Sequence, residues 1–486
     1  MARTLMLCAL LIALPCVVRA DDAPTQTVIR LAVTSQAAPK PALRYQLLPE
    51  SREMNPGNPI QGYLVCFMEQ TNFYNDKTEV ENREKWLTMP LKELPLKELH
   101  DYGGVGLRQA DYAARLDKPD WQILLKLRRD GVNTLLPDVQ VMRRLASGLK
   151  VRFRAEVAER RFGDALVTAK TMFALSRHLG EHPTFIGDLV ALAIAFMTVG
   201  PVEEMIQQPG CPNLYWALSD LPAPFIDFRQ GRLGERDETD VEFVLLDEKE
   251  PMSDAQLKQA LDHFRKLIAG QHLENALWAD PPKPPKPPPE TPCAAPPLDD
   301  EKPESKDEVG DFVAARAGDA DRVRAARKRL VEWGLTEDKA KQFPAQQVIL
   351  LDEKHEYERV CDEGLKLMSL PYWQAEKFLA AVPKEKGRLF DFQTNCLTLR
   401  QAAARLDQRI ALLRCVEALR MVAAENDGKL PAKLADVNVP MPLDPITGQP
   451  FAYQLDGDTA TLHGTAPRGR EKAAAFNVRY EVTIVK

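Results

Sequence analysis

The stretch AERRFGDAL, residues 158–166, lies between two segments whose apolar residues recur at helical spacing. Leu149, Phe153 and Val157 precede it at intervals of one helical turn. The matching residues after it are Phe162, Ala165, Leu166, Ala169, Met172 and Phe173. A third segment, residues 189–197, is an unbroken apolar run that falls short of the ~20 residues needed to span a bilayer. Residues 154–216 therefore predict three packed helices in a protein core.

The composition is that of a globular protein with an acidic balance. The chain has 486 residues, of which 45% are hydrophobic, so we expect about two to four domains with sizeable cores. Its formal net charge is -6. Nucleic acid is not expected as a partner, because phosphate binding requires clustered lysine and arginine.

Residues 1–20 have the three-part order of a secretory signal. Arg3 supplies the positive charge, residues 4–18 the apolar run, and Val18 and Ala20 the small residues of a cleavage site. We expect cleavage before Asp21 and export to the periplasm or the exterior, with no transmembrane segment afterwards. An uncleaved anchor helix is the alternative. Cleavage moves the formal charge from -6 to -8, because Arg3 and Arg19 leave with the signal.

The cysteines are sparse and widely spaced. Cys8 and Cys16 lie in the signal, and the remaining six include no C-x-x-C pair, which argues against a zinc knuckle, a thioredoxin-type motif or an attached haem. These six are Cys66, Cys211, Cys293, Cys361, Cys396 and Cys415. Export permits disulfides, but buried free thiols fit the same sequence.

The fold class that these patterns predict is mainly α: irregular helical hairpins, a short N-terminal β pair and a small C-terminal α+β element. The β pair is expected at residues 27–33 and 42–48, where branched or aromatic residues mix with polar ones. A capping box, Ser253 with Gln256, begins a helix expected to end at Gly270. The last helix is expected at residues 399–425, and the strands after it at 451–455, 459–463 and 480–485.

The expected organisation of the chain follows from changes in composition. It is a signal peptide at 1–20, a β-containing segment at 21–78, a helical domain at 79–280, a linker at 281–308, a second helical domain at 309–425 and a β-rich element at 426–486. The linker is predicted because eleven prolines fall between Pro281 and Pro303 and acidic residues follow. Such a segment favours an extended, disordered and solvated chain, and a P-x-x-P docking site is the alternative.

Two short motifs could carry chemistry. Ser147 and Lys150 match S-x-x-K, in which the lysine activates a serine nucleophile, but no K-T-G element follows. His178, Glu181 and His182 match H-x-x-E-H, in which two histidines on one helix face bind zinc. Gly180 and Pro183 instead indicate a helix end, where a histidine more often meets terminal carbonyls.

Two acidic clusters could supply paired carboxylates. Asp352, Glu353 and Glu356 form one, and Asp362 with Glu363 forms the other. A solvated helix face explains them equally well. No residue is therefore assigned a catalytic, cofactor-binding or metal-binding role, and no cofactor is expected.

Three resemblances add to these patterns. Residues 158–165 resemble part of one tetratricopeptide helix hairpin, which implies a helical packing surface. Residues 43–49, 209–218 and 370–375 are similar to recurring phrases of an uncharacterised family of large secreted proteins from planctomycete-type bacteria. Residues 430–434 and 444–453 are similar to the C-terminal part of type II secretion pseudopilins, which implies a helix leading into a small sheet.

The function expected from the sequence is that of an exported, non-enzymatic helical scaffold that binds another protein. It follows from amphipathic helices without a convincing catalytic constellation. The alternative is a periplasmic hydrolase whose site forms from scattered residues, for instance the acids near Asp352 and Asp362. The oligomeric state is left open.

Overall fold

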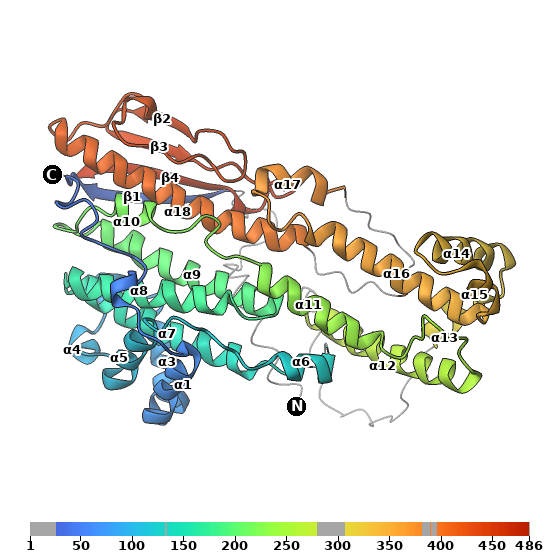
Figure 1. Ribbon diagram of the computed structural model, residues 1–486. Helices are drawn as coiled ribbons and strands as arrows, with labels where there is room; N and C mark the ends of the chain where they lie inside the picture. Colours follow the sequence, from blue (N-terminus) through green and yellow to red (C-terminus); the bar gives the residue numbers. More distant parts are fainter. Residues whose placement is uncertain (1–25, 132–133, 279–306, 382–388, 390–395, 486) are drawn as a thin grey trace, which may run out of the picture. The chain divides into compact units, whose positions relative to one another are not determined.

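The computed structural model describes residues 26–131, 134–278, 307–381, 389 and 396–485 (Figure 1). The predicted signal at 1–20, Cys293 and nearly all of the predicted linker lie outside these residues. The described chain is mainly α-helical with one four-stranded sheet, which confirms the predicted fold class.

Two compact units make up the chain, and each combines segments that are distant in sequence. The described residues of the larger unit are 26–131, 134–239, 363–381 and 396–485. Those of the smaller unit are 240–278, 307–362 and 389. Helices α11 (Arg229–Glu242) and α16 (Ala345–Leu365) contain the points where the chain passes from one unit to the other.

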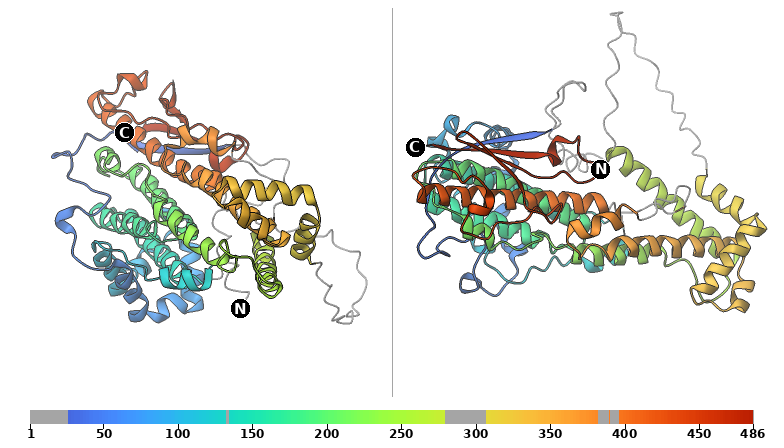
Figure 2. Two further views of the ribbon diagram at one scale, coloured as in Figure 1. Left: turned by 45° about the vertical axis from the view of Figure 1, so that its right-hand side comes forward. Right: turned by 90° about the horizontal axis from the view of Figure 1, so that it is seen from above.

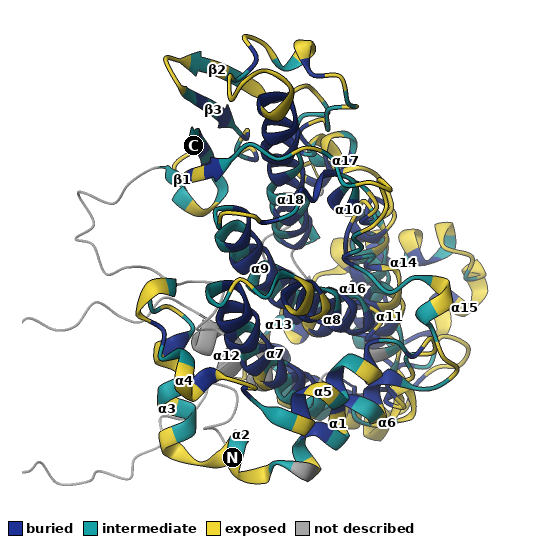
Figure 3. Cartoon of the chain, turned by 90° about the vertical axis from the view of Figure 1, so that its left-hand side faces the viewer, coloured by how far each residue is buried: buried dark blue, intermediate teal, exposed yellow. Residues whose placement is uncertain are grey.

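Helices form most of the larger unit. They are α1 (Pro59–Glu69), α2 (Thr71–Asn75), α3 (Lys77–Trp86), α4 (Leu96–Leu99), α5 (Gly104–Ala113), α6 (Leu124–Asp130), α7 (Pro137–Ala158), α8 (Phe162–Leu179), α9 (Phe185–Ile206), α10 (Tyr215–Ser219), α17 (Tyr372–Leu379) and α18 (Cys396–Glu425). In Figure 3, α7, α8, α9 and α18 are buried along most of their length.

The three helices predicted around residues 158–166 are α7, α8 and α9, and they pack on one another. Pro137 begins α7, where its missing N–H costs nothing, and the Thr184 hydroxyl caps α9 by accepting the N–H of Gly187 at 3.1 Å. By length and composition α9 could cross a membrane, but 67% of its most apolar window is buried inside the protein. We therefore interpret α9 as a core helix.

The sheet joins the two ends of the described chain. Its strands are β1 (Thr27–Thr34), β2 (Ala452–Asp456), β3 (Thr459–His463) and β4 (Val478–Val485), in the order β1-β4-β3-β2. β2, β3 and β4 pair antiparallel, as the C-terminal pattern predicts, whereas β1 pairs parallel to β4. α18 lies along one face of the sheet (Figures 1 and 2).

Two sequence expectations were wrong in detail. Residues 42–48 form turns and not the second strand of an N-terminal β pair, because β1 pairs with β4 instead. Helix α12 (Asp254–Trp278) begins at the predicted Ser253 and Gln256 box but runs through Gly270. One glycine inside a helix costs only about 1 kcal/mol, which the rest of a long helix offsets.

A buried ion pair ties α18 to the rest of the larger unit. The side chains of Arg420 and Glu417 are both 0% exposed and meet at 2.8 Å. The Arg420 guanidinium also donates to the carbonyls of Thr34, at the end of β1, and Cys211. The second oxygen of Glu417 accepts the N–H of Leu214 at 2.7 Å.

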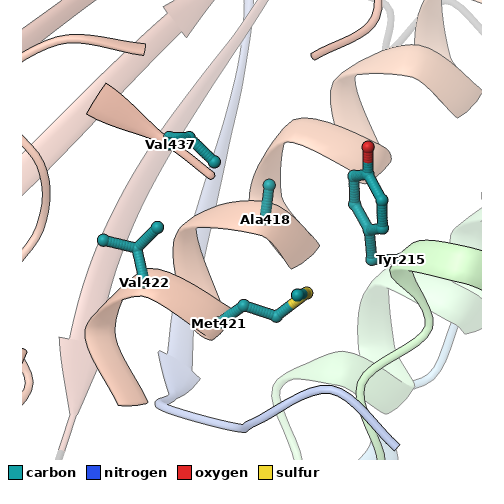
Figure 4. Close-up of a cluster of buried hydrophobic side chains, with 5 residues drawn as sticks. All are labelled: Tyr215, Ala418, Met421, Val422 and Val437. Atoms are coloured by element: carbon teal, nitrogen blue, oxygen red, sulfur yellow. The ribbon is translucent and has the colours of Figure 1, made fainter. Parts of the chain in front are cut away.

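An apolar cluster flanks this ion pair. It consists of Tyr215 from α10, Ala418, Met421 and Val422 from α18, and Val437 from the segment before β2 (Figure 4). The hydroxyl of Tyr215 donates to the carbonyl of Pro440, so its one polar atom is satisfied within the cluster. α10 is thus fixed against α18 by apolar and polar contacts together.

The smaller unit contains α12, α13 (Glu308–Ala317), α14 (Ala320–Glu332), α15 (Glu337–Gln342) and most of α16. Phe243, Phe264 and Tyr357 form its aromatic core, with ring centroids 5.8 and 5.9 Å apart. The buried amide of Gln347 on α16 donates to the carbonyls of Asp247 and Glu250 and accepts the N–H of Met252. This amide fixes the loop that leads into α12.

We predict that Glu417→Gln lowers the unfolding free energy by about 3 to 5 kcal/mol, because it leaves a buried guanidinium without its counter-charge. Urea unfolding of the full chain, followed by far-UV circular dichroism, measures the change. Lys77→Ala is the control, since Lys77 forms an exposed pair with Glu81 on α3 and its loss should change stability by less than about 0.5 kcal/mol. Equal effects of the two substitutions would contradict the assignment.

Candidate functional site

The S-x-x-K motif lies inside α7, and its serine makes a hydrogen bond within that helix. The Ser147 hydroxyl donates to the carbonyl of Arg143 at 3.2 Å, one turn earlier, and is not hydrogen-bonded to Lys150. Burial and the neighbouring Arg154 lower the pKa of Lys150. Without contact between hydroxyl and amine, the arrangement lacks the base that a serine nucleophile requires.

The H-x-x-E-H motif lies where α8 ends, so its two histidines do not share a helix face. His178 is in the last turn of α8, and its Nδ1 is 2.9 Å from the Tyr63 hydroxyl of α1. His182 lies in the following turn, with Nδ1 2.8 Å from the Thr184 hydroxyl and its ring edge-on to Trp121. The two side chains therefore serve separate contacts in the core.

Burial keeps both histidines neutral. It lowers the pKa of His178 to about 4, with a smaller contribution from Arg177, and that of His182 to about 4. Asp138 lies 3.9 Å from Nε2 of His182, and burial raises the pKa of this carboxyl. Both shifts favour the uncharged forms, so this contact is not an ion pair. Such weakly basic imidazoles do not suit general-base chemistry near neutral pH.

Asp188, in the first turn of α9 after the H-x-x-E-H motif, has a buried carboxyl group. The residue is 0% exposed, and neither carboxyl oxygen has a hydrogen-bond partner among the described residues. Burial, together with Glu235 and Asp227, raises its pKa well above the ordinary value. Gly231 of α11 packs directly on it, since a Cβ there would lie 2.2 Å from Oδ2. The tight packing leaves no room for a substrate beside this carboxyl.

The acids at 352, 353, 356 and 363 contact different partners. Asp352 accepts two hydrogen bonds from Arg329 of α14, at 2.7 and 2.6 Å. Glu353 accepts the N–H of Leu389 at 2.9 Å. Glu356 pairs with Arg359, and Glu363 pairs with Lys366. The guanidinium of Arg329 therefore engages both oxygens of Asp352, which gives this acid a structural role.

Metal binding and redox chemistry gain no site from the described residues. In this part of the chain, no group of three or more His, Cys, Asp or Glu side chains is placed to hold a metal ion. Cys211 and Cys415 are buried free thiols, and burial raises the pKa of each to about 12. They are therefore inert thiols, as buried cysteines usually are.

A surface depression of about 510 Å³ opens in the smaller unit beside the start of α12. It is lined by residues 244–249 with Gln256 and Gln259. The Asp247 carboxylate at its edge accepts the N–H groups of Lys249 and Glu250, which lowers its pKa. This acid closes a turn and is not directed at a ligand.

An exposed apolar surface is present on helices α1 and α5 of the larger unit. Leu64 and Met68 are 39% and 78% exposed on α1, and Val105 and Tyr112 are 58% and 54% exposed on α5. The two helices pack antiparallel, because Gly62 lies against Ala113 at one end and the Gln70 side chain against Gly106 at the other. This order places Met68 near the level of Val105 and Leu64 near that of Tyr112. We call these four residues the α1–α5 surface.

The glycine in α1 permits this close helix pairing. A Cβ at Gly62 would lie 2.8 Å from the Cβ of Ala113, so any larger residue would push α1 and α5 apart. The two helices are therefore in direct contact along this side of α1.

A polar network fixes α5 to the core helices below it. Asp111 accepts two hydrogen bonds from Arg152 of α7, at 3.1 and 2.6 Å, and one from Thr171 of α8 at 2.7 Å. Arg152 also donates to Thr168, whose hydroxyl donates to Glu156 at 2.6 Å. Burial raises the pKa of Glu156 to about 7. The α1–α5 surface therefore stands on a rigid support.

Comparison of the chain with protein-family models, with curated proteins and with solved structures finds no match. The resemblances in the sequence therefore stay predictions. The functional argument depends on the contacts and exposure of this chain's own residues, including those of the α1–α5 surface.

Acidification should unfold the protein partly through its two buried histidines. Their unfolded pKa is near 6.5 and their folded pKa is about 4, so the stability they contribute is complete above about pH 6.5 and is lost as the pH falls toward 4. Each accounts for up to about 3 kcal/mol over this window. We expect His178→Gln and His182→Gln to reduce the pH slope of the unfolding free energy, measured by urea titration at several pH values.

His100 provides the matched control, because its side chain is 73% exposed. His100→Gln should leave the surroundings of the two buried histidines unchanged. An unchanged slope in both buried variants would show that carboxyl groups alone govern acid unfolding.

Proposed function

We propose that the protein is a helical scaffold that binds another protein through the α1–α5 surface. The observation that carries the proposal is the exposure of four large apolar side chains on two adjoining helices. Isolated exposed apolar residues are ordinary, but several on two adjoining helices are typical of interaction sites.

An amphipathic helix is the partner element that best fits this surface. Leu64 and Met68 are one turn apart, and Val105 and Tyr112 are two turns apart on the antiparallel neighbour. A third helix packed on α1 and α5 would place its own i, i+3, i+4 residues against these exposed side chains. Met68 and Tyr112 suit such a contact, since methionine adapts its shape and tyrosine combines an apolar ring with a polar end.

The export that the sequence predicts supports the same proposal. Residues 1–20 predict a secretory signal, and an exported scaffold would meet its partners in the periplasm or outside the cell. The hydrolase alternative is less favoured at Asp352, whose carboxylate accepts two hydrogen bonds from Arg329. The scaffold is therefore the function that the described residues favour.

Replacing the apolar side chains of the surface should abolish partner binding without unfolding the protein. We expect Met68→Asp and Val105→Asp to keep the circular dichroism spectrum, because both side chains point to solvent, and to lose partner binding by about tenfold or more. A photo-crosslinking residue at Tyr112 of the full chain, used in envelope extracts, would capture the partner and locate the crosslinked peptide by mass spectrometry.

The control is Leu125→Asp, since Leu125 is 82% exposed on α6 and outside the surface. It should retain the crosslinked partner. Equal capture by all three variants, or a crosslinked peptide without an amphipathic helical pattern, would contradict the proposal.

A further inference from the structure

Helix α11 packs its first two turns closely against the start of α9, within the larger unit. Two glycines of α11, one turn apart, permit this packing. A Cβ at Gly231 would lie 2.2 Å from Oδ2 of Asp188, and a Cβ at Gly234 would lie 1.7 Å from the carbonyl oxygen of Pro183. The backbone of α11 therefore rests directly on residues 183–188.

The carboxyl group of Asp188 is enclosed at this contact without a hydrogen bond. The residue is 0% exposed, and both of its carboxyl oxygens are buried and lack a partner among the described residues. An ionised carboxylate in such a place would lose its hydration and gain no donor in exchange. The packed helices therefore accept the neutral carboxyl group and disfavour the carboxylate.

Two other acids strengthen this preference. Glu235 of α11 and Asp227, just before α11, both raise the pKa of the buried carboxyl beyond the effect of burial. The Glu235 carboxylate accepts the N–H of Phe185, the first residue of α9, at 3.2 Å. Burial raises the pKa of Asp227, but hydrogen bonds from Arg229, one of them 2.6 Å long, lower it overall. Asp227 therefore keeps its negative charge beside this contact.

The remaining neighbours do not supply a compensating charge. The side chain of His182 lies against Gly187, one residue before Asp188, and is neutral because burial lowers its pKa to about 4. Arg177 of α8 donates to the carbonyl of Phe225 at 2.8 Å. In the described part of the chain, no cation forms an ion pair with Asp188.

We propose that Asp188 is a pH-sensitive latch, which holds α11 on α9 when its carboxyl is protonated and releases α11 when the carboxyl ionises. On ionisation the proton passes to water, and the carboxylate reaches its own hydration only if Gly231 moves away from it. The chain enters the smaller unit at Asp240 of the same helix, so release frees the segment that leads there. The latch is independent of the α1–α5 surface.

The direction of the pH dependence follows from the two states of the carboxyl. With α11 released, the carboxyl lies in water and has a pKa of about 3.9. With α11 packed, its pKa is well above the ordinary value. The latch is therefore strongest below about pH 4 and weakens as the pH rises toward the packed-state pKa, by up to about tenfold per pH unit. His178 and His182 act in the opposite direction, so the two effects can be separated.

Hydrogen exchange of the full chain, followed by mass spectrometry, measures the release directly. After correction for the intrinsic effect of pH on exchange, the amides of residues 229–239 should lose protection by about tenfold or more between pH 5 and pH 8. Peptides from residues 410–420 of α18 serve as an internal reference and should keep their protection. In Asp188→Asn, whose side chain does not ionise, protection of residues 229–239 should not depend on pH.

Asp164→Asn is the matched control, because Asp164 also lies in the first turn of a helix, α8, but its side chain is 59% exposed. This variant should keep the full pH dependence. Gly231→Ala should lower the protection of residues 229–239 already at pH 5, since its Cβ displaces α11 from Asp188.

Unchanged protection of residues 229–239 from pH 5 to pH 8 in the unsubstituted chain would overturn the proposal. The same holds if Asp188→Asn keeps the pH dependence, or if Gly231→Ala is as protected at pH 5 as the unsubstituted chain. If Asp188→Asn fails to fold, the pH series of the unsubstituted chain and the Gly231→Ala result still decide the outcome.

Discussion

The buried pair of Arg420 and Glu417 is the interaction on which the arrangement of the larger unit depends. Neither side chain is exposed, so both charges must be satisfied by protein atoms. The acceptors and donors come from Thr34 at the end of β1 and from residues 211–214 before α10, hundreds of residues away in sequence. The pair is complete only when the N-terminal strand, the loop after α9 and the C-terminal helix have all assembled. Specificity of assembly, more than net stabilisation, is what such a pair contributes.

Local sequence signals predicted the long helices well. Helices α7 to α9 and α18 have sustained apolar periodicity and recognisable ends, and the strands β2 to β4 lie close to the ranges expected for them, 451–455, 459–463 and 480–485. The partner of β1 could not be predicted in this way. Residues 42–48 have a strand-like composition, but β4 offers a free edge that is already supported by α18, and only the folded chain brings that edge to β1. The pairing of β1 with β4, whose partner residues are 451 positions apart, cannot be detected in a local sequence pattern.

Candidate sites were harder to predict, because the chemical role of a side chain depends on the residues that surround it in the fold. The spacing of His178 and His182 fits a zinc motif, yet Tyr63 and Trp121, from distant segments, determine that both rings are core side chains. The α1–α5 surface was not predicted, for a different reason. Residues 63–68 are mostly apolar in the sequence, but periodicity shows only which residues share a helix face, and not whether another element covers that face. Gly62 was the available signal, since a glycine inside a helix often marks close contact with a neighbour.

Helix α18 joins the parts of the larger unit through its arginines as well as through its apolar residues. Arg409 pairs with Glu203 of α9, and Arg420 pairs with Glu417 of its own helix while donating to the carbonyls of Thr34 and Cys211. Arg405 and Arg414 instead lie over aromatic rings, those of Phe196 on α9 and Tyr215 on α10. Each of these guanidinium groups therefore contacts an element that is distant in sequence. Because an arginine can satisfy a charged pair, a carbonyl or an aromatic ring, the same residue type serves several different neighbours along one helix.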